Sequence, residues 1–141
     1  MIRYTTELSD ISPQMLIGFF VGWPNPPSSQ THYRILARSA EIVLAVDDEK
    51  DQVVGFVTAI SDGVLSAYIP FLEVLPRYQH RGIGTELIKR LLAQLRDIYM
   101  VDLLCDQEVQ PFYLRCGLNE AVGMMARNYS NQSGAGLNKA D

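Results

Sequence analysis

The stretch that decides the fold reads LEVLPRYQHRGIGT and covers residues 72–85. Its first part is typical of a strand and ends at Pro76, which lacks the amide proton that a sheet ladder requires. From Gly84 onward the apolar residues recur at intervals of three and four, as on the buried face of an amphipathic helix: Leu87, Ile88, Leu91, Leu92 and Leu95. The stretch therefore predicts a strand, a glycine-containing loop and a long helix that opens at about Gly82.

The rest of the chain alternates between strand-like and helix-like segments. We expect strands at 3–8, 41–46, 52–60, 64–75, 100–105 and 121–129, and helices at 13–21, 28–39, 82–95 and 109–115. Three consecutive strands joined by short turns are typical of an antiparallel meander. The order of elements favours an α+β or mixed α/β sheet domain. No internal repeat or linker divides the chain, so we expect one domain over 1–129 and, because its end is rich in Gly, Asn and Ser, a flexible tail over 130–141.

The loop before the long helix has the features of an anion site. First-turn amides of a helix lack intrahelical acceptors, and the helix dipole makes that end partly positive. Glycine lets an anion approach the backbone without a Cβ in the way. With His80 and Arg81 beside Gly82 and Gly84, the loop predicts a pyrophosphate site. A P-loop is excluded because its Gly-Lys-Ser/Thr ending is absent, and a dinucleotide fingerprint because Leu87 occupies the place of the third glycine.

The charge distribution supports the same site. The chain has 12 Lys and Arg against 16 Asp and Glu, a formal net charge of −4. Residues 77–96 reverse this balance with five basic side chains against Glu86 alone: Arg77, Arg81, Lys89, Arg90 and Arg96. A local positive charge within an acidic chain suits a small polyanion better than a nucleic acid. A solvated basic helix face is the alternative interpretation.

Composition indicates an ordinary globular chain. Of the 141 residues, 48% are hydrophobic and 20% are charged. No apolar run approaches the roughly 20 residues of a membrane-spanning helix, and residues 1–7 do not resemble a secretory signal. Cys105 and Cys116 fit no metal-ligand spacing. We therefore expect a cytoplasmic protein with reduced cysteines, without a metal and without a membrane partner.

The motif Gln79-x-x-Gly82-x-Gly84, between a strand and a helix, resembles the acyl-CoA signature of the GNAT superfamily of N-acetyltransferases. The resemblance extends over roughly residues 2–129, because the Val-x-Pro strand ending and the later Phe112-Tyr113-x-x-x-Gly117 element follow in the family's order. It implies a central, mostly antiparallel twisted sheet of six or seven strands with a splay between strands 4 and 5, flanked by about four helices. It also implies acetyl-CoA as co-substrate and an amine as acceptor.

The resemblance assigns a set of residues to acetyl-CoA. The splayed strand would offer main-chain groups to the pantetheine arm, and the glycine loop would hold the pyrophosphate through backbone amides. Asp106 stands where many members have an asparagine that contacts the pantetheine. The implied set is Leu72, Glu73, Val74, Gln79, His80, Arg81, Gly82, Ile83, Gly84, Thr85, Asp106, Phe112 and Tyr113.

Two residues are candidates for acid–base chemistry. Tyr113 matches the family's usual general acid, which protonates or orients the departing CoA sulfur, although an aromatic that packs the short helix is the alternative. Glu73 is the candidate base for the amine, acting through water, and a solvated or ion-paired glutamate is the alternative. The Val74 main chain is available to stabilise negative charge on the thioester oxygen. We expect His32 to pack or to be exposed rather than to catalyse.

The acceptor pocket is expected between the first two helices. Phe20, Trp23 and Tyr33 would form an apolar wall, and this region more loosely resembles members that act on arylalkylamines such as serotonin. Core packing explains the same aromatics, and a protein N-terminus or lysine remains an open acceptor. The favoured function is direct acetyl transfer to a small-molecule primary amine within a ternary complex. The alternative is a CoA-binding regulator without catalysis. A homodimer is a further expectation.

Overall fold

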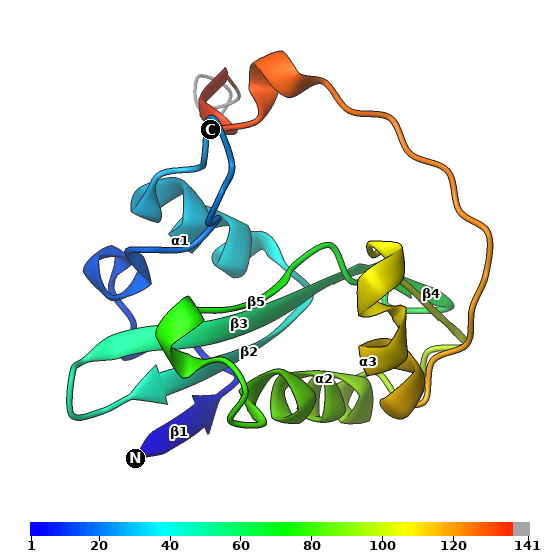
Figure 1. Ribbon diagram of the computed structural model, residues 1–141, viewed down its shortest axis with the longest axis horizontal. Coiled ribbons are helices and arrows are strands. Elements are labelled where there is room, and N and C mark those ends of the chain that lie inside the picture. Colours follow the sequence, from blue (N-terminus) through cyan, green and yellow to red (C-terminus); the bar gives the residue numbers. More distant parts are fainter. Residues whose placement is uncertain (137–141) are drawn as a thin grey trace.

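A six-stranded sheet lies at the centre of the computed structural model, which describes residues 1–136 (Figure 1). The strands are β1 (Ile2–Thr5), β2 (Glu41–Asp47), β3 (Gln52–Ser61), β4 (Ser66–Tyr68), β5 (Leu72–Val74) and β6 (Met100–Asp102). Their order is β1-β2-β3-β4-β6, and β5 pairs with β3 beside β4. Every pair is antiparallel except β4 with β6, which is parallel. The expected mixed, mostly antiparallel sheet is confirmed.

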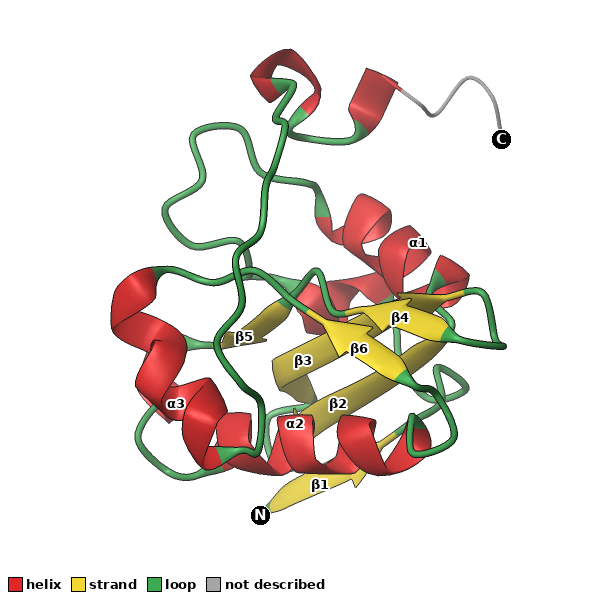
Figure 2. Ribbon diagram, turned by 90° about the vertical axis from the view of Figure 1, so that its right-hand side faces the viewer, coloured by secondary structure: helices red, strands yellow, loops and turns green. Residues whose placement is uncertain are grey.

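The third strand of the meander is divided. The expected strand at 64–75 is wrong as a single element, because β4 pairs with the end of β3 and β5 pairs with its middle. Pro70 lies between the two parts and cannot donate to a ladder. The last bond toward β6 is donated by the Ile69 amide to the Asp102 carbonyl at 2.9 Å. Beyond it, residues 69–74 and 103–105 run apart (Figure 2), and we call this region the fork.

Helices cover both faces of the sheet (Figure 2). The described residues form α1 (Ser29–Arg38), α2 (Ile83–Gln94) and α3 (Gln110–Arg115), with 3-10 turns η1 (Pro13–Leu16), η2 (Pro76–Tyr78), η3 (Gln107–Val109) and η4 (Tyr129–Asn131). Leu87 and Ile83 of α2 pack over Gly55, where an added Cβ would lie 3.1 and 3.2 Å from their side chains. On the opposite face, η1 and α1 pack over Phe56. Because both faces are covered, β2 and β3 are almost wholly buried.

The first expected helix, over 13–21, is wrong. Only the four residues of η1 are helical, and Gly18 and Phe20 then take positive φ values of 106° and 63°. Such left-handed backbone ends a right-handed helix, and it is costly for a phenylalanine. The chain therefore has three α-helices among its described residues rather than about four.

The expected closing strand at 121–129 is also wrong. Residues 119–128 have no regular structure, and residues 121–130 are all exposed. We call residues 119–128 the arm, since Figure 1 shows this segment running around the outside of the molecule from α3 toward α1. A strand requires a neighbouring strand for its backbone groups, and the arm has none within the described part of this chain.

The end of the arm returns to the body beside α1. The Asn25 amide donates a hydrogen bond to Gln132 Oε1 at 2.9 Å, and residues 132–134 are half-buried. The expected flexible tail thus starts with a contact to the body. Residues 137–141 lie outside the described part of the structure. Within residues 1–136, no helix is long and apolar enough to cross a bilayer.

A buried hydrogen bond joins the β2–β3 hairpin to the loop before α2. Tyr78 in η2 donates its hydroxyl to Asp47 Oδ2 at 2.6 Å, and Asp47 Oδ1 accepts from the Glu49 amide at 3.1 Å. The Tyr78 hydroxyl lowers the pKa of Asp47, and the same hydrogen bond raises the pKa of Tyr78. This bond fixes the position from which the glycine loop departs.

Candidate active site

The N-terminus of α2 presents free backbone amides. Gly82, the residue before the helix, has a left-handed φ of 81°, and no side chain of the described residues caps this end. An added Cβ at Gly82 would meet nothing within 4 Å, whereas one at Gly84 would lie 3.5 Å from the Phe112 ring. The first-turn amides are therefore both unpartnered within the helix and open on the Gly82 side. This is the geometry of an anion site, as the sequence predicts.

Basic side chains surround this end of α2. Arg81 donates to the Arg77 carbonyl at 3.0 Å, and its guanidinium lies 5.1 Å from the Tyr78 ring centroid. His80 is exposed, with a φ of 64°. Further along the helix, Arg90 pairs with Glu86 at 2.6 Å, so that these two charges offset each other. The positive charge nearest the free amides thus comes from Arg77 and Arg81.

The open edge of β5 follows from its register on β3. The Leu75 amide donates to the Val54 carbonyl at 2.8 Å, and the Thr58 amide to the Phe71 carbonyl at 3.1 Å. Because hydrogen-bonded pairs alternate in an antiparallel ladder, Glu73 exchanges its backbone bonds with Phe56.

Leu72 and Val74 consequently turn their amides and carbonyls toward the fork. Three residues were expected to offer main-chain groups to the fork. Leu72 and Val74 do so, and Glu73 does not. Gln79 Nε2 donates to the Val74 carbonyl at 3.0 Å. The Val74 amide and both backbone groups of Leu72 remain on the open edge.

The Glu73 side chain binds the turn that follows η1. Its Oε1 accepts from the Phe20 amide at 2.8 Å and its Oε2 from the Val21 amide at 3.2 Å. Both carboxylate oxygens are thus engaged by backbone donors. Since Phe20 has a left-handed backbone, these two charge-assisted bonds hold a strained turn in place. The arrangement favours a structural role for Glu73, which is neither the expected base nor the alternative of a solvated or ion-paired glutamate.

Aromatic rings line the α1 side of the fork. Phe20 lies 4.9 Å from Trp23 and 5.8 Å from Phe71 between ring centroids, and Phe71 occupies the break between β4 and β5. Trp23 is 37% exposed, while Phe20 is buried. Two of the three expected acceptor residues are therefore together at the fork. Tyr33 is half-buried on α1, and no ring contact joins it to them among the described residues.

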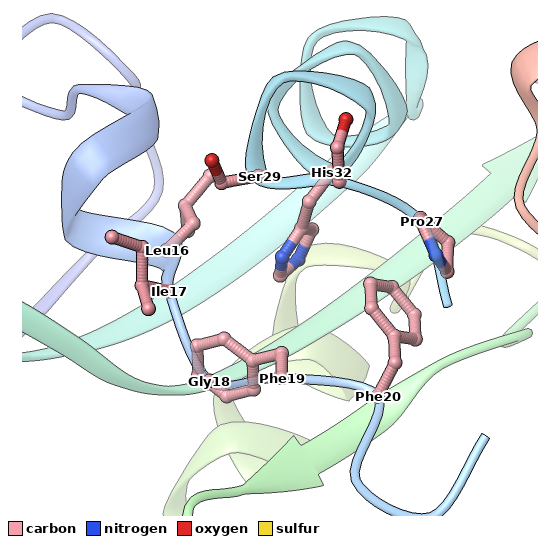
Figure 3. Close-up of a pocket in the computed structure, with 9 residues that line it drawn as sticks. Leu16, Ile17, Gly18, Phe19, Phe20, Pro27, Ser29 and His32 are labelled. Atoms are coloured by element: carbon pink, nitrogen blue, oxygen red, sulfur yellow. The ribbon is translucent and has the colours of Figure 1, made fainter. Parts of the chain in front are cut away.

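His32 is a residue that the sequence did not lead us to assign to a site. Its side chain points from α1 toward Phe19 and Phe20 (Figure 3), and it is only 1% exposed. Within residues 1–136, neither ring nitrogen has a hydrogen-bond partner, and burial lowers the pKa of His32 to about 4. The sequence spacing could have indicated that His32 is buried, because His32 lies four residues before the buried Leu36, on the same helix face.

Tyr113 lies on α3 beside the end of β6. Its ring meets that of Phe112 edge-on at 5.0 Å, and Phe112 in turn packs on Gly84 at the start of α2. Burial, with smaller contributions from Cys105 and Cys116, raises the pKa of Tyr113 to about 12. The phenol therefore keeps its proton throughout the physiological range. No hydrogen bond joins Tyr113 to Glu73 in the described part of the chain.

The remaining expected residues are peripheral or supporting. Asp106 is exposed immediately before η3, and its carboxylate caps no amide. Thr85 is exposed on the first turn of α2, and Ile83 is buried against the sheet. Within residues 1–136, no group of three or more His, Cys, Asp or Glu is placed to hold a metal ion.

A strand fork beside an uncapped, basic helix start is the arrangement that the sequence resemblance implies for an acetyltransferase. Comparison with known families agrees: the profile of the Acetyltransferase (GNAT) family matches residues 8–118. The chain belongs to the GNAT family of acetyltransferases.

Individual relatives are similar to different extents. A solved structure of a proposed acetyltransferase from Deinococcus radiodurans R1 is 51% identical, with 94% of this chain and 92% of that one covered and a TM-score of 0.91. GCN5-related N-acetyltransferase 3, chloroplastic, of Arabidopsis thaliana is 42% identical over 71 residues, which cover 49% of this chain and 30% of that protein. The uncharacterised N-acetyltransferase ycf52 of Pyropia yezoensis is 30% identical, with coverages of 69% and 58%. The matched part of this chain thus spans 30% and 58% of the length of these two curated relatives.

The Glu73 bonds generate a stability prediction. Glu73→Ala leaves the Phe20 and Val21 amides without their acceptor, so we expect the free energy of unfolding to fall by about 1–3 kcal/mol. Glu73→Gln keeps one carbonyl oxygen and should lose roughly half as much. Urea denaturation measures both. Glu108→Ala, at an exposed carboxylate, is the matched control. Equal unfolding midpoints for Glu73→Ala and the control would contradict the assignment.

Proposed function

We propose that this protein transfers the acetyl group of acetyl-CoA to the primary amine of a small molecule, by direct attack within a ternary complex. The observation that carries the proposal is the open edge of Leu72 and Val74 next to the uncapped N-terminus of α2. A buried or half-buried backbone group without a partner is costly, so this edge favours an extended ligand that supplies the missing bonds. Membership of the family supports the same co-substrate.

The residues present fit acetyl-CoA. The free amides at the start of α2, with Arg77 and Arg81 nearby, would hold the pyrophosphate, and the space over Gly82 admits it. The backbone groups of Leu72 and Val74 would pair with the amides of the pantetheine arm. When bound, the thioester supplies an acetyl group that is already activated toward amines. The Val74 amide, which points into the fork, is the donor available to negative charge on the thioester oxygen.

Tyr113 is the proton-bearing group on the α3 side of the fork. A phenol whose pKa is raised to about 12 donates a hydrogen bond to a thiolate, but it gives up its proton reluctantly. We therefore assign Tyr113 chiefly to orienting and stabilising the leaving sulfur. Since Glu73 is engaged by two amides, we favour water as the carrier of the proton from the amine, and Glu73 as a positioning residue that holds Phe20.

The α1 side of the fork is the place for the acceptor. Phe20, Trp23 and Phe71 form a contiguous aromatic wall there, with Trp23 accessible to solvent. Such a wall suits an amine with an apolar or aromatic substituent, and it attracts the ammonium form through the ring faces. A cytoplasmic location stays a prediction from the sequence.

Acetyl-CoA binding is the first test. Gly84→Val places a branched side chain against Phe112, a member of the implied acetyl-CoA set, so we expect the dissociation constant for acetyl-CoA to rise roughly tenfold or more. Ala93→Val adds the same branched side chain near the other end of the helix and should bind like the unmodified protein. Isothermal titration calorimetry measures both. An absence of saturable binding by the unmodified chain would overturn the proposal, and binding without transfer to any amine would favour the regulator.

The role of Tyr113 predicts a kinetic signature. Tyr113→Phe should lower kcat about tenfold to a hundredfold and leave the KM for acetyl-CoA nearly unchanged, because the hydroxyl acts on the leaving sulfur. In the unmodified protein, kcat should show no alkaline fall due to Tyr113 below about pH 11, since the raised pKa keeps the phenol protonated. Steady-state assays with thiol detection give both values. A kcat equal to that of the unmodified enzyme would refute the assignment.

We also propose that two copies associate through the arm. Val122 and Met124 are 100% and 95% exposed, which is unusual for two apolar side chains so close in sequence. A cavity of about 890 Å³ lies between the arm, the outer side of β6 and α3. The charges of the arm are self-complementary. In an antiparallel pairing about a two-fold axis between Gly123 and Met124, Glu120 faces Arg127 of the partner subunit. A second copy of the arm is thus the occupant that this surface suits.

The proposed pairing predicts charge reversal and rescue. Glu120→Arg and Arg127→Glu should each weaken the dimer by placing like charges opposite one another, while the double variant should restore it. Light scattering after size-exclusion chromatography over a concentration series measures the association. A monomer at all concentrations, or a double variant as weak as the singles, would contradict this arrangement.

A further inference from the structure

A row of side chains on one face of the sheet leads along β3 to the apex of the fork. Residues 56, 58 and 60 of β3 pair in turn with Glu73, Phe71 and Tyr68. Alternate residues of a strand point to one face, and residues directly opposite each other share it. The three side chains therefore lie on the face of the Phe56 ring, which contacts the Phe71 ring at 6.4 Å between centroids. This is the α1 face, where the acceptor is expected.

The end of β6 adds an acidic side chain to this row. β4 and β6 run parallel and side by side (Figure 2), and Tyr68 lies opposite Asp102. Neighbouring strands are about 4.8 Å apart, and a strand rises about 3.3 Å per residue, so Asp102 lies one strand and roughly two residues away from Phe71. The Asp102 carbonyl accepts the last hydrogen bond before the fork, from the Ile69 amide at 2.9 Å. Asp102 thus stands at the apex of the fork on the α1 face.

Glu73 and Asp102 are two carboxylates on this face, and they differ in their partners. Both oxygens of Glu73 accept from backbone amides, those of Phe20 and Val21. The carboxylate of Asp102 is exposed, and within residues 1–136 it forms no hydrogen bond or ion pair. A cation that enters the fork from this face therefore meets Asp102 as the carboxylate whose oxygens are unengaged.

The cavity at the fork offers no positive charge to Asp102. Tyr68, Asp102 and Tyr113 all line the cavity of about 890 Å³ described above. Its described lining residues include the acidic side chains of Asp102 and Glu120 and no Lys, Arg or His. In the paired arrangement of the arms, Glu120 faces Arg127 of the partner subunit, which leaves Asp102 without a basic group. The cavity is thus acidic at its fork end.

This environment selects a donor-only cation. A carboxylate accepts hydrogen bonds and cannot donate them, and charge-assisted bonds from an ammonium are among the stronger ones. A phosphate or a carboxylate ligand would be repelled by Asp102. A metal ion is disfavoured, because within residues 1–136 no group of three or more His, Cys, Asp or Glu is placed to hold one. An ammonium is therefore the group that suits the apex.

We propose that Asp102 binds the ammonium group of the acceptor at the apex of the fork, while the apolar part of the acceptor rests on Phe71 and Trp23. This assignment rests on the proposed function and adds the residue that orients its acceptor. The nitrogen would lie at the end of the open edge of Leu72 and Val74, along which the thioester would be held. The ammonium must lose a proton before its nitrogen attacks, and water remains the carrier of that proton.

Binding is tested without any catalytic assay. With free CoA present, NMR titrations compare 2-phenylethylamine with 2-phenylethanol, which has nearly the same shape and no charge. The unmodified protein should bind the amine about tenfold more tightly than the alcohol, because only the amine forms a charge-assisted bond. Asp102→Asn and Asp102→Ser should bind the two alike. Two variants are used so that a folding defect in one does not decide the result.

A matched variant controls for the change in net charge. Asp97→Asn removes one negative charge at an exposed position outside the cavity, so it should keep the preference for the amine. Equal affinities for amine and alcohol in the unmodified protein would overturn the assignment. A preference for the amine that survives in a folded Asp102 variant would do the same.

Steady-state kinetics distinguish acceptor binding from other roles of Asp102. Asp102→Asn should raise the KM for 2-phenylethylamine about tenfold and change kcat less than about threefold, and Asp102→Glu, which keeps the charge, should recover part of the loss. A fall in kcat at an unchanged KM would contradict a binding role. If no amine is acetylated, the proposed function fails, but the titrations still decide whether Asp102 binds an ammonium. The two failures are therefore distinguishable.

Discussion

The separation of β5 from β6 is the constraint on which the rest of the structure depends. Two neighbouring strands that diverge leave backbone donors and acceptors without partners, and such groups are stable only where solvent or a ligand supplies the bonds. Here the divergence is enforced by Pro70 at the break and by the pairing of β5 with the middle of β3. Once β5 is committed to β3, its other edge cannot be closed by the same chain.

At the fork, the two faces of the sheet carry different kinds of groups. Successive side chains of β5 point to opposite faces, so that Val74 lies near Gly84 of α2 while Glu73 reaches the turn at Phe20. The α2 face carries the free amides and the basic side chains. The α1 face carries the aromatic wall and His32. A co-substrate and an acceptor could thus approach the same backbone edge from opposite faces without competing for side chains.

Local patterns in the sequence were sufficient for part of this structure. The glycine loop, the amphipathic stripe of α2 and the β2–β3 hairpin depend on residues close together in the chain, and they form where expected. The division of the third strand at Pro70 depends on which part of β3 each half pairs with, which is not a local property. The helix expected over 13–21 was shortened by a tertiary contact, because Glu73 binds amides that a continuous helix would have used internally.

The candidate site shows the same limit. The anion loop and Tyr113 were expected from a motif and their roles stay predictions, whereas the orientation of the Glu73 backbone follows from strand register, which a sequence does not display. His32 packs among aromatic rings, which is one of the two roles expected for it, but a lone histidine on an apolar helix face does not by itself indicate which rings it will contact. A small cavity beside it is formed by η1 and the turn at 17–20, whose shapes were not those expected.

The hydrogen bond between Tyr78 and Asp47 has a consequence for how this chain tolerates changes in length. Residues 48–51 form an exposed turn at the tip of the hairpin, and residues added after Lys50 would extend into solvent without breaking the Arg3–Asp48 ion pair or the Glu49–Asp47 hydrogen bond. An insertion one or two positions before residue 48 would instead displace Asp47 along β2, past the register shift between Ala45 and Val46. Tyr78 would then lose its hydrogen-bond acceptor, and the start of the glycine loop would no longer be held in position. Loop grafts and peptide tags at this end of the molecule should therefore begin after Lys50.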